Sequence, residues 1–521
     1  MDSAADVGKR ISTAFCQFKG RVFLTLALVS VSSLVVILTV LSGSVNLNET
    51  PFLERPTSVA SRPPQIGALQ RTGRLHFHVA ASTANKQLCR AIVSSAVNRY
   101  GPPILAGWNA TNKKDIGKTH LAKVRVVSEH LDNMAPDTDD DLFLLIDGYD
   151  VQLQLGPEVL IQRYFKVVAA EDERIIQQLG PALAEEVAGP LGRHVVFGAD
   201  KVCWPTDQRR PGCWAIPPVP GMDDRMFGPL TESGDMAFLR PRWLNSGTIM
   251  GPVKEVRSLF RATLAHINAT YRPDYEFRES DQFYMTEVWG LQELGRINAQ
   301  LEKDPKAKHP SHVDDAFWPK PGPESNHHIA IDYWSNLFQT WAGYTEYVDW
   351  RTFDRPGHAF TVDQNVRAEV TFRPWDLHLA GDAMRAIHRI FASTKRSTLM
   401  GKTSDKLILE SQFGSNIITK TTLPIYHCTG AKDALETFWP RMWFFPYIRT
   451  LMRSAIASCR AGEAYTPQPV DGRMWYPALP YPEDIRLDDA GAWSDGSADS
   501  GEVEWLSFET LCRPFEGDIF G

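Results

Sequence analysis

The sequence contains little cysteine and no excess of basic residues, and each shortage excludes a class of protein. Seven cysteines occur among 521 residues, and none form a Cys-x-x-Cys pair, so a structural zinc site is not predicted. Lys and Arg total 55 against 62 Asp and Glu, which gives a net charge of −7. Nucleic acid is therefore excluded as a main partner, because phosphate contacts require clustered basic side chains.

Apolar and aromatic residues are abundant by contrast. Hydrophobic residues make up 43% of the chain, with 15 Trp and 26 Phe, which is enough to build a large core. The length predicts one large domain or two ordinary ones. No internal repeat is evident.

An uncharged apolar run from Val22 to Leu41 is the first localised signal. Its length of about 20 residues matches a membrane-spanning helix and exceeds the apolar core of a cleaved signal peptide. Basic residues precede the run, at positions 9, 10, 19 and 21, which favours a cytosolic N-terminus. The sequence thus predicts a cytoplasmic tail at 1–21, a signal anchor at 22–42, and a single-pass type II protein of the Golgi or ER membrane.

The residues after this run fit a lumenal location. Residues 43–73 are rich in Ser, Pro, Thr and Gly and predict a flexible stem. Asn48, Asn109 and Asn268 each begin an Asn-x-Thr triplet and are candidate glycosylation sites in the lumen. Cys16 falls on the cytosolic side, and the other six cysteines could pair in any of 15 ways.

Strands and helices are predicted to alternate from residue 75. Strands are expected at 75–81, 104–108 and 142–146, with helices at 88–100 and 122–131 between them. This alternation predicts an α/β domain with a largely parallel sheet covered on both faces. We expect the domain to occupy 74–450, with a surface insertion at about 351–420. The Pro-, Gly- and acid-rich extension at 451–521 is expected to wrap the domain or to be partly disordered.

Two carboxylates follow the apolar strand at 142–146. Asp147 and Asp150 lie three residues apart, and Gly148 between them eases the turn. Ligands of open α/β sheets bind beyond the carboxyl ends of strands, and Mg²⁺ or Mn²⁺ prefers oxygen ligands. The pair is a candidate metal site, and an ordinary Asp-rich turn is the alternative.

Six sequence motifs, taken in order along the chain, resemble those of a known family. The chain resembles the glycosyltransferase domain of the procollagen lysyl hydroxylase/glycosyltransferase family over residues 75 to about 445. The matching segments are Asp-Gly-Tyr-Asp at 147–150, Val-Phe-Gly-Ala-Asp-Lys-Val-Cys-Trp-Pro at 196–205, Trp-Leu-Asn-Ser-Gly at 243–247, Ser-Asp-Gln-Phe-Tyr at 280–284, Ile-Ala-Ile-Asp-Tyr at 329–333 with Leu-Phe-Gln at 337–339, and Pro-Ile-Tyr-His-Cys-Thr-Gly at 424–430.

The resemblance implies a fold and a set of site residues. The expected fold is a GT-A-like, Rossmann-type mixed sheet flanked by helices, preceded here by one transmembrane helix. Asp147, Asp150 and His427 would bind Mn²⁺ or Mg²⁺. The residues expected near the UDP-sugar donor are Trp108, Lys123, Asn245, Ser246 and Gly247.

The remaining implied positions concern the acceptor and the wall of the site. Trp204 would lie on the acceptor side, and Asp281 would be the general base of an inverting reaction or a positioning group in a retaining one. Asp332 and Gln339 would support the wall of the site. The chain departs from the family at Ser280, which replaces a carboxylate, and at 119–122, where Thr-His-Leu-Ala replaces glycines.

The sequence thus predicts a metal-dependent glycosyltransferase that moves a sugar from a UDP-sugar to a hydroxyl of a protein or glycan. A catalytically inactive lumenal protein that binds a nucleotide or glycan is the alternative. An iron-dependent lysyl hydroxylase is discounted, because residues 447–521 contain no His for the iron triad.

Overall fold

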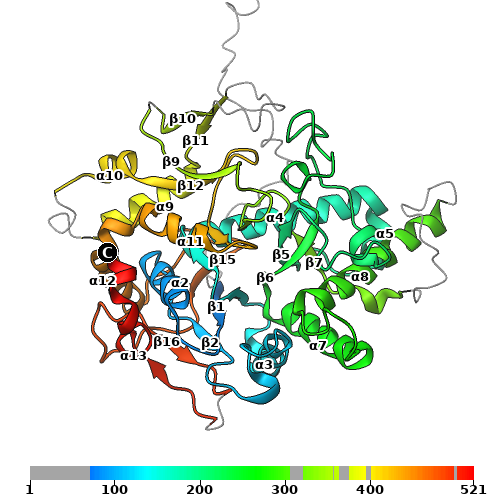
Figure 1. The fold of residues 1–521 in the computed structure, drawn as a ribbon, viewed down its shortest axis with the longest axis horizontal. Coiled ribbons are helices and arrows are strands. Elements are labelled where there is room, and N and C mark those ends of the chain that lie inside the picture. Colours follow the sequence, from blue (N-terminus) through cyan, green and yellow to red (C-terminus); the bar gives the residue numbers. More distant parts are fainter. Residues whose placement is uncertain (1–70, 305–320, 356, 363–374, 395–400, 498–500) are drawn as a thin grey trace, which may run out of the picture. The chain divides into compact units, whose positions relative to one another are not determined.

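A mixed β-sheet lies at the centre of the fold (Figure 1). The structure, a computed structural model, describes residues 71–304, 321–355, 357–362, 375–394, 401–497 and 501–521. The strand order is β17-β16-β2-β1-β3-β6-β5-β7, and β15 also pairs with β1. The strands are β1 (Arg71–Ala80), β2 (Ile104–Ala106), β3 (Leu142–Asp147), β5 (Val195–Asp200), β6 (Trp243–Pro252), β7 (Ile329–Ile331), β15 (Arg473–Pro477), β16 (Ala492–Ser494) and β17 (Trp505–Leu506).

The strand directions confirm a mixed sheet. Strands β2, β3 and β15 run parallel to β1, and β7 runs parallel to β5. Strand β6 is antiparallel to both of its neighbours, β3 and β5. The carboxyl ends of β1, β3 and β5 therefore meet at one edge of the sheet, where a ligand site is expected.

Helices cover both faces of the sheet because alternate side chains of its strands are apolar on each face. Along β3, Leu144 and Ile146 join one core cluster, and Phe143 and Leu145 join the other. The first cluster includes α2 (Lys86–Val97), α4 (Pro157–Leu179) and α12 (Ile448–Arg460). The second includes α3 (Leu121–Asn133), α7 (Val253–Thr270) and α8 (Asp281–Lys303).

The predicted transmembrane helix requires a correction. Within the described ranges, no helix is long and apolar enough to cross a membrane. The longest ones, α4 and α8, have 23 residues each, but charged side chains recur along both. The single-pass topology and the Golgi or ER membrane location are therefore not retained. The tail at 1–21, the anchor at 22–42, Cys16 and Asn48 lie outside the described residues.

A three-stranded sheet contains His427 and begins directly after Asp150. It has the order β4-β14-β8, with β4 (Val151–Leu153), β14 (Ile425–His427) and β8 (Phe338–Thr340). Strand β14 is antiparallel to β4 and parallel to β8. Chain segments separated by more than two hundred residues therefore meet directly beyond the end of β3.

The segment expected as an insertion at 351–420 contains regular structure wherever it is described. Its elements are β9 (Val348–Thr352), β10 (Ala359–Val362), β11 (Trp375–His378), α9 (Gly381–Ala392), α10 (Ser404–Glu410) and β12 (Gln412–Asn416), and β13 (Thr421–Thr422) follows. Strand β12 pairs with β9 and β13. Helix α9 buries Ala386, Ile387, Ile390 and Phe391 in the first core cluster, so this segment contributes to the core.

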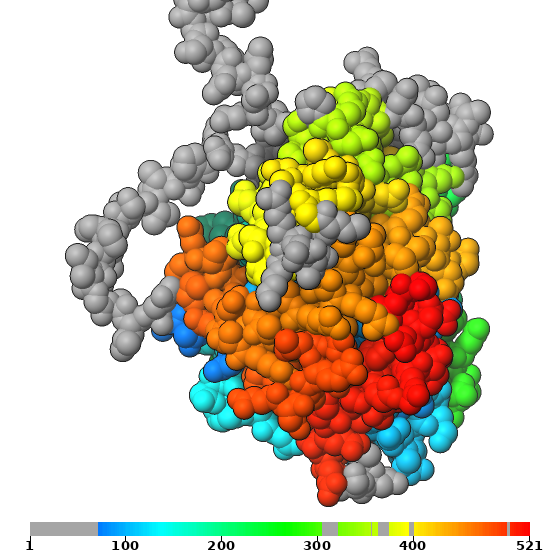
Figure 2. Space-filling model, turned by 90° about the vertical axis from the view of Figure 1, so that its left-hand side faces the viewer, coloured from blue at the N-terminus to red at the C-terminus, as the bar shows by residue number. Residues whose placement is uncertain are grey.

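The C-terminal residues are integrated into the main sheet. The expected domain boundary at 450 falls inside α12, and β15 and β16 pair with β1 and β2. A disulfide joins Cys89 of α2 to Cys512 at the end of α13 (Phe508–Cys512). Figure 2 shows these late segments, coloured orange and red, side by side over one face.

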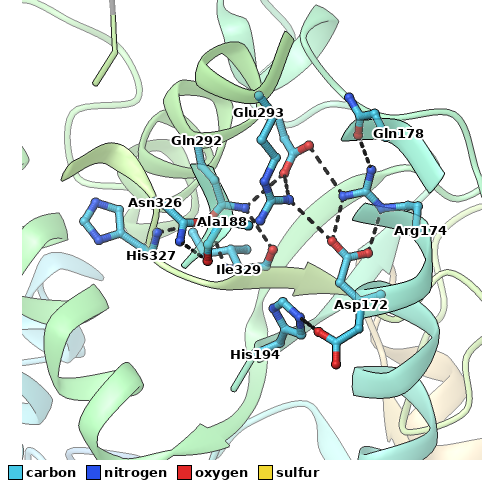
Figure 3. Close-up of polar contacts among 12 residues, drawn as sticks. Asp172, Arg174, Gln178, Ala188, His194, Gln292, Glu293, Asn326, His327 and Ile329 are labelled. Atoms are coloured by element: carbon cyan, nitrogen blue, oxygen red, sulfur yellow. Dashed lines mark hydrogen bonds and ion pairs between the residues drawn. The ribbon is translucent and has the colours of Figure 1, made fainter. Parts of the chain in front are cut away.

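A buried ionic network fixes α4 against α8 (Figure 3). Arg174 lies 2.6 Å from Glu171, and Arg296 lies 2.6 Å from Glu293 and 3.4 Å from Glu171. All four side chains are buried. Burial alone would raise the pKa of Glu171, but the two guanidinium groups outweigh it and lower that pKa. The network therefore balances two positive and two negative charges between the helices.

Candidate functional site

Three strand ends position the predicted metal ligands. Asp147 is the last residue of β3, Asp150 immediately precedes β4, and His427 is the last residue of β14. In the antiparallel pairing of β14 with β4, His427 lies opposite Val151. The Cys428 N–H donates to the Asp150 carbonyl oxygen at 2.8 Å, which fixes the two strand ends together.

The three side chains converge on one point. One ligand atom from each of Asp147, Asp150 and His427 lies within 4.8 Å of the others. The His427 Nε2 is 3.3 Å from Asp150 Oδ2. Two carboxylates and one imidazole suit a divalent cation such as Mn²⁺ that keeps further positions for substrate oxygens. The structure therefore brings together all three residues that the sequence proposed as ligands.

The Asn245 side chain orients His427. Its Oδ1 accepts from the Gly247 N–H at 3.1 Å and lies 3.0 Å from His427 Nδ1. Its Nδ2 donates to Asp200 Oδ2 at 2.9 Å. Because the amide oxygen can only accept, Nδ1–H donates to it, and Nε2 is the ring nitrogen left on the side of the carboxylates, 3.3 Å from Asp150 Oδ2. The role of Asn245 in donor binding stays a prediction, and in this structure its side chain contacts Asp200, Gly247 and His427.

Electrostatics reinforce this arrangement. Burial lowers the pKa of His427, but the nearby carboxylates of Asp150 and Asp147 outweigh burial and raise it. Burial raises the pKa of Asp150, whereas His427 and Lys432 lower it to below its usual range. The carboxylates and the basic groups of this cluster thus stabilise one another in their charged forms.

Gly247 leaves the space that the cluster occupies. A Cβ added there would lie 2.9 Å from Asp147 Oδ2 and closer still to the His427 ring. Real Cβ atoms do not approach other heavy atoms this closely, so no other residue fits without displacing a ligand. Its expected contact with the donor sugar stays a prediction, and its neighbours in the structure are the candidate metal ligands Asp147 and His427.

Lys123 bridges two carboxylates at the same strand edge. Its Nζ lies 2.9 Å from Asp147 Oδ1 and 2.5 Å from Asp281 Oδ2, and it donates to the Ser246 carbonyl oxygen at 3.1 Å. Burial raises the pKa of Asp281, but the Lys123 ammonium outweighs it and lowers the pKa. Asp281 is therefore ionised and paired in this state, and His120 Nδ1 lies 4.0 Å from its other oxygen.

The two departures from the family pattern have structural roles. Ser280 is the N-cap of α8, and its Oγ accepts from the Phe283 N–H at 3.3 Å. Thr119 precedes α3 and donates its hydroxyl to Glu279 at 2.5 Å. The bond of Thr119 joins the segment before α3 to the segment before α8.

Sequence reasoning missed Lys432. Its Nζ lies 2.5 Å from Asp150 Oδ2 and 2.5 Å from the Cys428 carbonyl oxygen, while half of the side chain (51%) stays exposed. An exposed ammonium beside a metal carboxylate can reach a bound diphosphate. The only signal in the sequence was a lysine just after the Gly430 turn, which is too common a feature to single out.

Tyr149 lies between the two aspartates, and the sequence assigns it no separate role. Its hydroxyl oxygen accepts from the Ser82 and Thr83 N–H groups at 2.9 and 3.0 Å. These bonds tie the turn at 147–150 to the segment between β1 and α2. The orientation of both aspartates therefore depends on this tyrosine as well as on β3.

The two predicted tryptophans differ in environment. Trp108 is buried in the core cluster that includes α2. Trp204 is 49% exposed and packs edge-on against Phe277, with ring centroids 5.4 Å apart. Cys203, next to it, forms a disulfide with Cys213, whereas Cys428 and Cys459 are free and buried.

The remaining candidates are structural or on the surface. The Asp332 carboxylate accepts from the N–H groups of Asn336, Leu337 and Phe338 at 2.7–2.9 Å. Gln339 is buried and bonds within β8 and to Asn416. Asn109 and Asn268 are exposed, so their use as glycosylation sites stays a prediction.

Comparison with known proteins identifies no relative of this chain. No protein-family profile matches the chain, and no curated protein matches it significantly.

Proposed function

We propose that this protein is a metal-dependent glycosyltransferase that moves a sugar from a UDP-sugar to a hydroxyl acceptor on a protein or glycan. The observation that carries the proposal is the convergence of Asp147, Asp150 and His427 beyond β3, with Gly247 providing the space. The two carboxylates, the imidazole and the orientation of His427 fit Mn²⁺ or Mg²⁺. A cation bound there would neutralise charge on the departing diphosphate.

Two lysines would assist the departure of UDP. Lys123 pairs with Asp147, and Lys432 pairs with Asp150. A diphosphate offers both ammonium groups a more highly charged partner, because a lysine acts as a point charge for phosphate. Charge neutralisation and alignment, rather than covalent chemistry, would supply most of the rate.

Asp281 would act on the acceptor once Lys123 turns to the donor. In the reaction the acceptor oxygen bonds to the anomeric carbon, and the bond from that carbon to the phosphate oxygen breaks. The bonding electron pair leaves on UDP, and the acceptor proton passes to a base. Release of Lys123 would raise the pKa of Asp281 and so strengthen it as that base in an inverting reaction. In a retaining reaction it would position the acceptor.

A donor screen tests the proposal. UDP release from UDP-glucose, UDP-galactose and UDP-N-acetylglucosamine is measured with Mn²⁺ and with EDTA. Asp147→Asn is expected to abolish release, whereas Asp132→Asn, on the exposed end of α3, is the matched control and should retain it. Absence of UDP release from all three donors by the unaltered chain would refute the proposal.

A protein that binds a nucleotide without turnover is the second candidate. The ion pair of Lys123 with Asp281 favours it, since a carboxylate with a lowered pKa is a weak base. Titration of UDP in the presence of Mn²⁺ distinguishes the two candidates. If UDP binding depends on Asp147 but no UDP-sugar is cleaved, the protein binds a nucleotide without turnover.

A further inference from the structure

His120 places an exposed imidazole beside the buried Asp281 carboxylate of the candidate site. The side chain of His120 is 74% exposed, whereas that of Asp281 is 6% exposed. The Nδ1 atom of His120 lies 4.0 Å from Asp281 Oδ1. The chain departs from the resembling family at 119–122, so the resemblance assigns no role to this histidine. The site thus contains a proton-accepting side chain that the proposed function has not used.

The two oxygens of the Asp281 carboxylate face different partners. Oδ2 lies 2.5 Å from Lys123 Nζ, which also lies 2.9 Å from Asp147 Oδ1. Lys123 therefore occupies the side of the carboxylate that leads to the candidate metal ligands. Oδ1 is the oxygen next to His120. Because the side chain of His120 is exposed, this second side is open to a molecule that arrives from solvent.

The main chain around His120 is fixed, whereas its ring is free to turn. His120 is the N-cap of α3, and within the described structure its side chain makes no capping bond to that helix. The hydroxyl of Thr119 donates to Glu279 at 2.5 Å and accepts from the Leu121 N–H at 3.2 Å. These bonds hold the main chain in place. Rotation about its side-chain bonds can bring the exposed ring closer to Asp281.

Asp281 alone is a poor proton acceptor in this state. Burial raises its pKa, but Lys123 outweighs burial and, together with His120, lowers it. An imidazole is the side chain best suited to exchange protons near neutral pH. A carboxylate that accepts from Nδ1–H holds the ring in the tautomer whose Nε2 can take a proton. Catalytic hydrogen bonds are often long without substrate and shorten when it binds, so a separation of 4.0 Å is compatible with this pairing.

On the basis of the proposed function in its inverting form, we infer that His120 is the general base and that Asp281 is the positioning residue that orients its imidazole. The acceptor hydroxyl gives its proton to Nε2 of His120 while its oxygen bonds to the anomeric carbon. The bond from that carbon to the phosphate oxygen breaks, and its electron pair leaves on UDP. The imidazolium pairs with the Asp281 carboxylate and then returns the proton to water. This route does not require Lys123 to leave Asp281, whereas proton transfer to Asp281 itself does.

Hydrolysis of a UDP-sugar with Mn²⁺ tests this assignment in the full chain, because water is then the acceptor. The donor is whichever of UDP-glucose, UDP-galactose and UDP-N-acetylglucosamine the unaltered chain cleaves. His120→Gln should lower kcat for UDP release by about 100-fold or more, the usual contribution of a general base. The Kd for UDP with Mn²⁺, measured calorimetrically, should not change. Lys118→Gln is the matched control, because Lys118 is 71% exposed on the same segment, and it should alter neither value.

Two further measurements separate this role from others. Free imidazole should restore part of the rate to His120→Gln, because it can occupy the exposed space left by the ring. It should not restore Asp281→Asn, in which the histidine is still present. Proton NMR, recorded before mutarotation, should show that an α-linked donor releases its sugar as the β anomer, since a retaining transfer would not need this base.

Failure of this assignment and failure of the proposed function give different results. If the unaltered chain releases no UDP from any donor, the proposed function fails and the assignment of His120 fails with it. If the unaltered chain is active, the assignment alone is overturned when His120→Gln keeps its kcat, loses UDP binding or gains no rate from imidazole. It is also overturned when the released sugar keeps the α configuration.

Discussion

Replacing Gly247 by alanine tests the central geometry of the candidate metal site. The added Cβ would lie 2.9 Å from Asp147 Oδ2 and nearer still to the ring of His427. Neither neighbour can move easily. Asp147 ends β3 and pairs with Lys123, and His427 is fixed by the β14 ladder and by its bond to Asn245. One of the ligands must therefore leave its position.

The expected loss follows from the size of the clash. Forcing one extra carbon into a packed site costs about 1–3 kcal/mol. If His427 swings away to relieve that strain, the whole amount is lost from metal binding. Because each 1.4 kcal/mol is a factor of ten, the Kd for Mn²⁺ should rise by about 5- to 150-fold. The free energy of unfolding without metal should change less, since a displaced side chain leaves the fold intact.

Calorimetric titration with Mn²⁺ at fixed pH measures this change, and chemical denaturation in EDTA measures stability. Gly517→Ala is the matched control, because a Cβ there meets no atom within 4 Å. An unchanged Kd for Gly247→Ala, alongside binding abolished in Asp147→Asn, would show that His427 and Gly247 do not share the space described above.

Three further substitutions probe the surroundings. Asn245→Ala should weaken Mn²⁺ binding by about 10- to 100-fold in the same titration, because it removes the group that orients His427; unchanged affinity would rule out that role. Lys432→Ala should tighten Mn²⁺ binding, since no ammonium then competes for Asp150, but should weaken UDP binding, and a loss of both would contradict this account. Glu171→Gln should lower the free energy of unfolding at pH 7 by about 3–5 kcal/mol, because it leaves two buried guanidinium groups short of a partner. The folded-state pKa of Glu171 is lowered, so its contribution is present above the unfolded pKa of about 4.3 and is lost as pH falls through the folded value. The difference between the two proteins in denaturation midpoint should therefore shrink from pH 7 to pH 3; a constant difference would contradict the linkage.

The aspartates could be found from local sequence because their signal is local. An apolar strand followed by Asp, Gly and Asp places carboxylates at a sheet edge whatever the rest of the chain does. His427 could not be found in this way, because its position depends on the pairing of β14 with β4, which no neighbouring residue encodes. Only the resemblance singled it out, and Lys432 was missed for the same reason.

The strands of the C-terminal region could not be predicted from the sequence for a different reason. Its strands β15, β16 and β17 have only two to five residues and include Pro, Trp and polar side chains. Such short elements have no readable periodicity, so composition alone favoured a loose extension. The apolar run from Val22 to Leu41 led to the predicted membrane anchor and location, but no helix within the described residues could cross a membrane.

The pairing of β15 with β1 also bears on how the chain is made. Arg71 lies beside Arg473, and Cys89 is joined to Cys512 across 423 positions. At a synthesis rate of about 5–20 residues per second, roughly 20–80 s separate the appearance of the two partners. During that time half of an edge of the central strand lacks its neighbour, and exposed strand edges invite association with other chains. This part of the β1 edge therefore stays open to such association until β15 has been made.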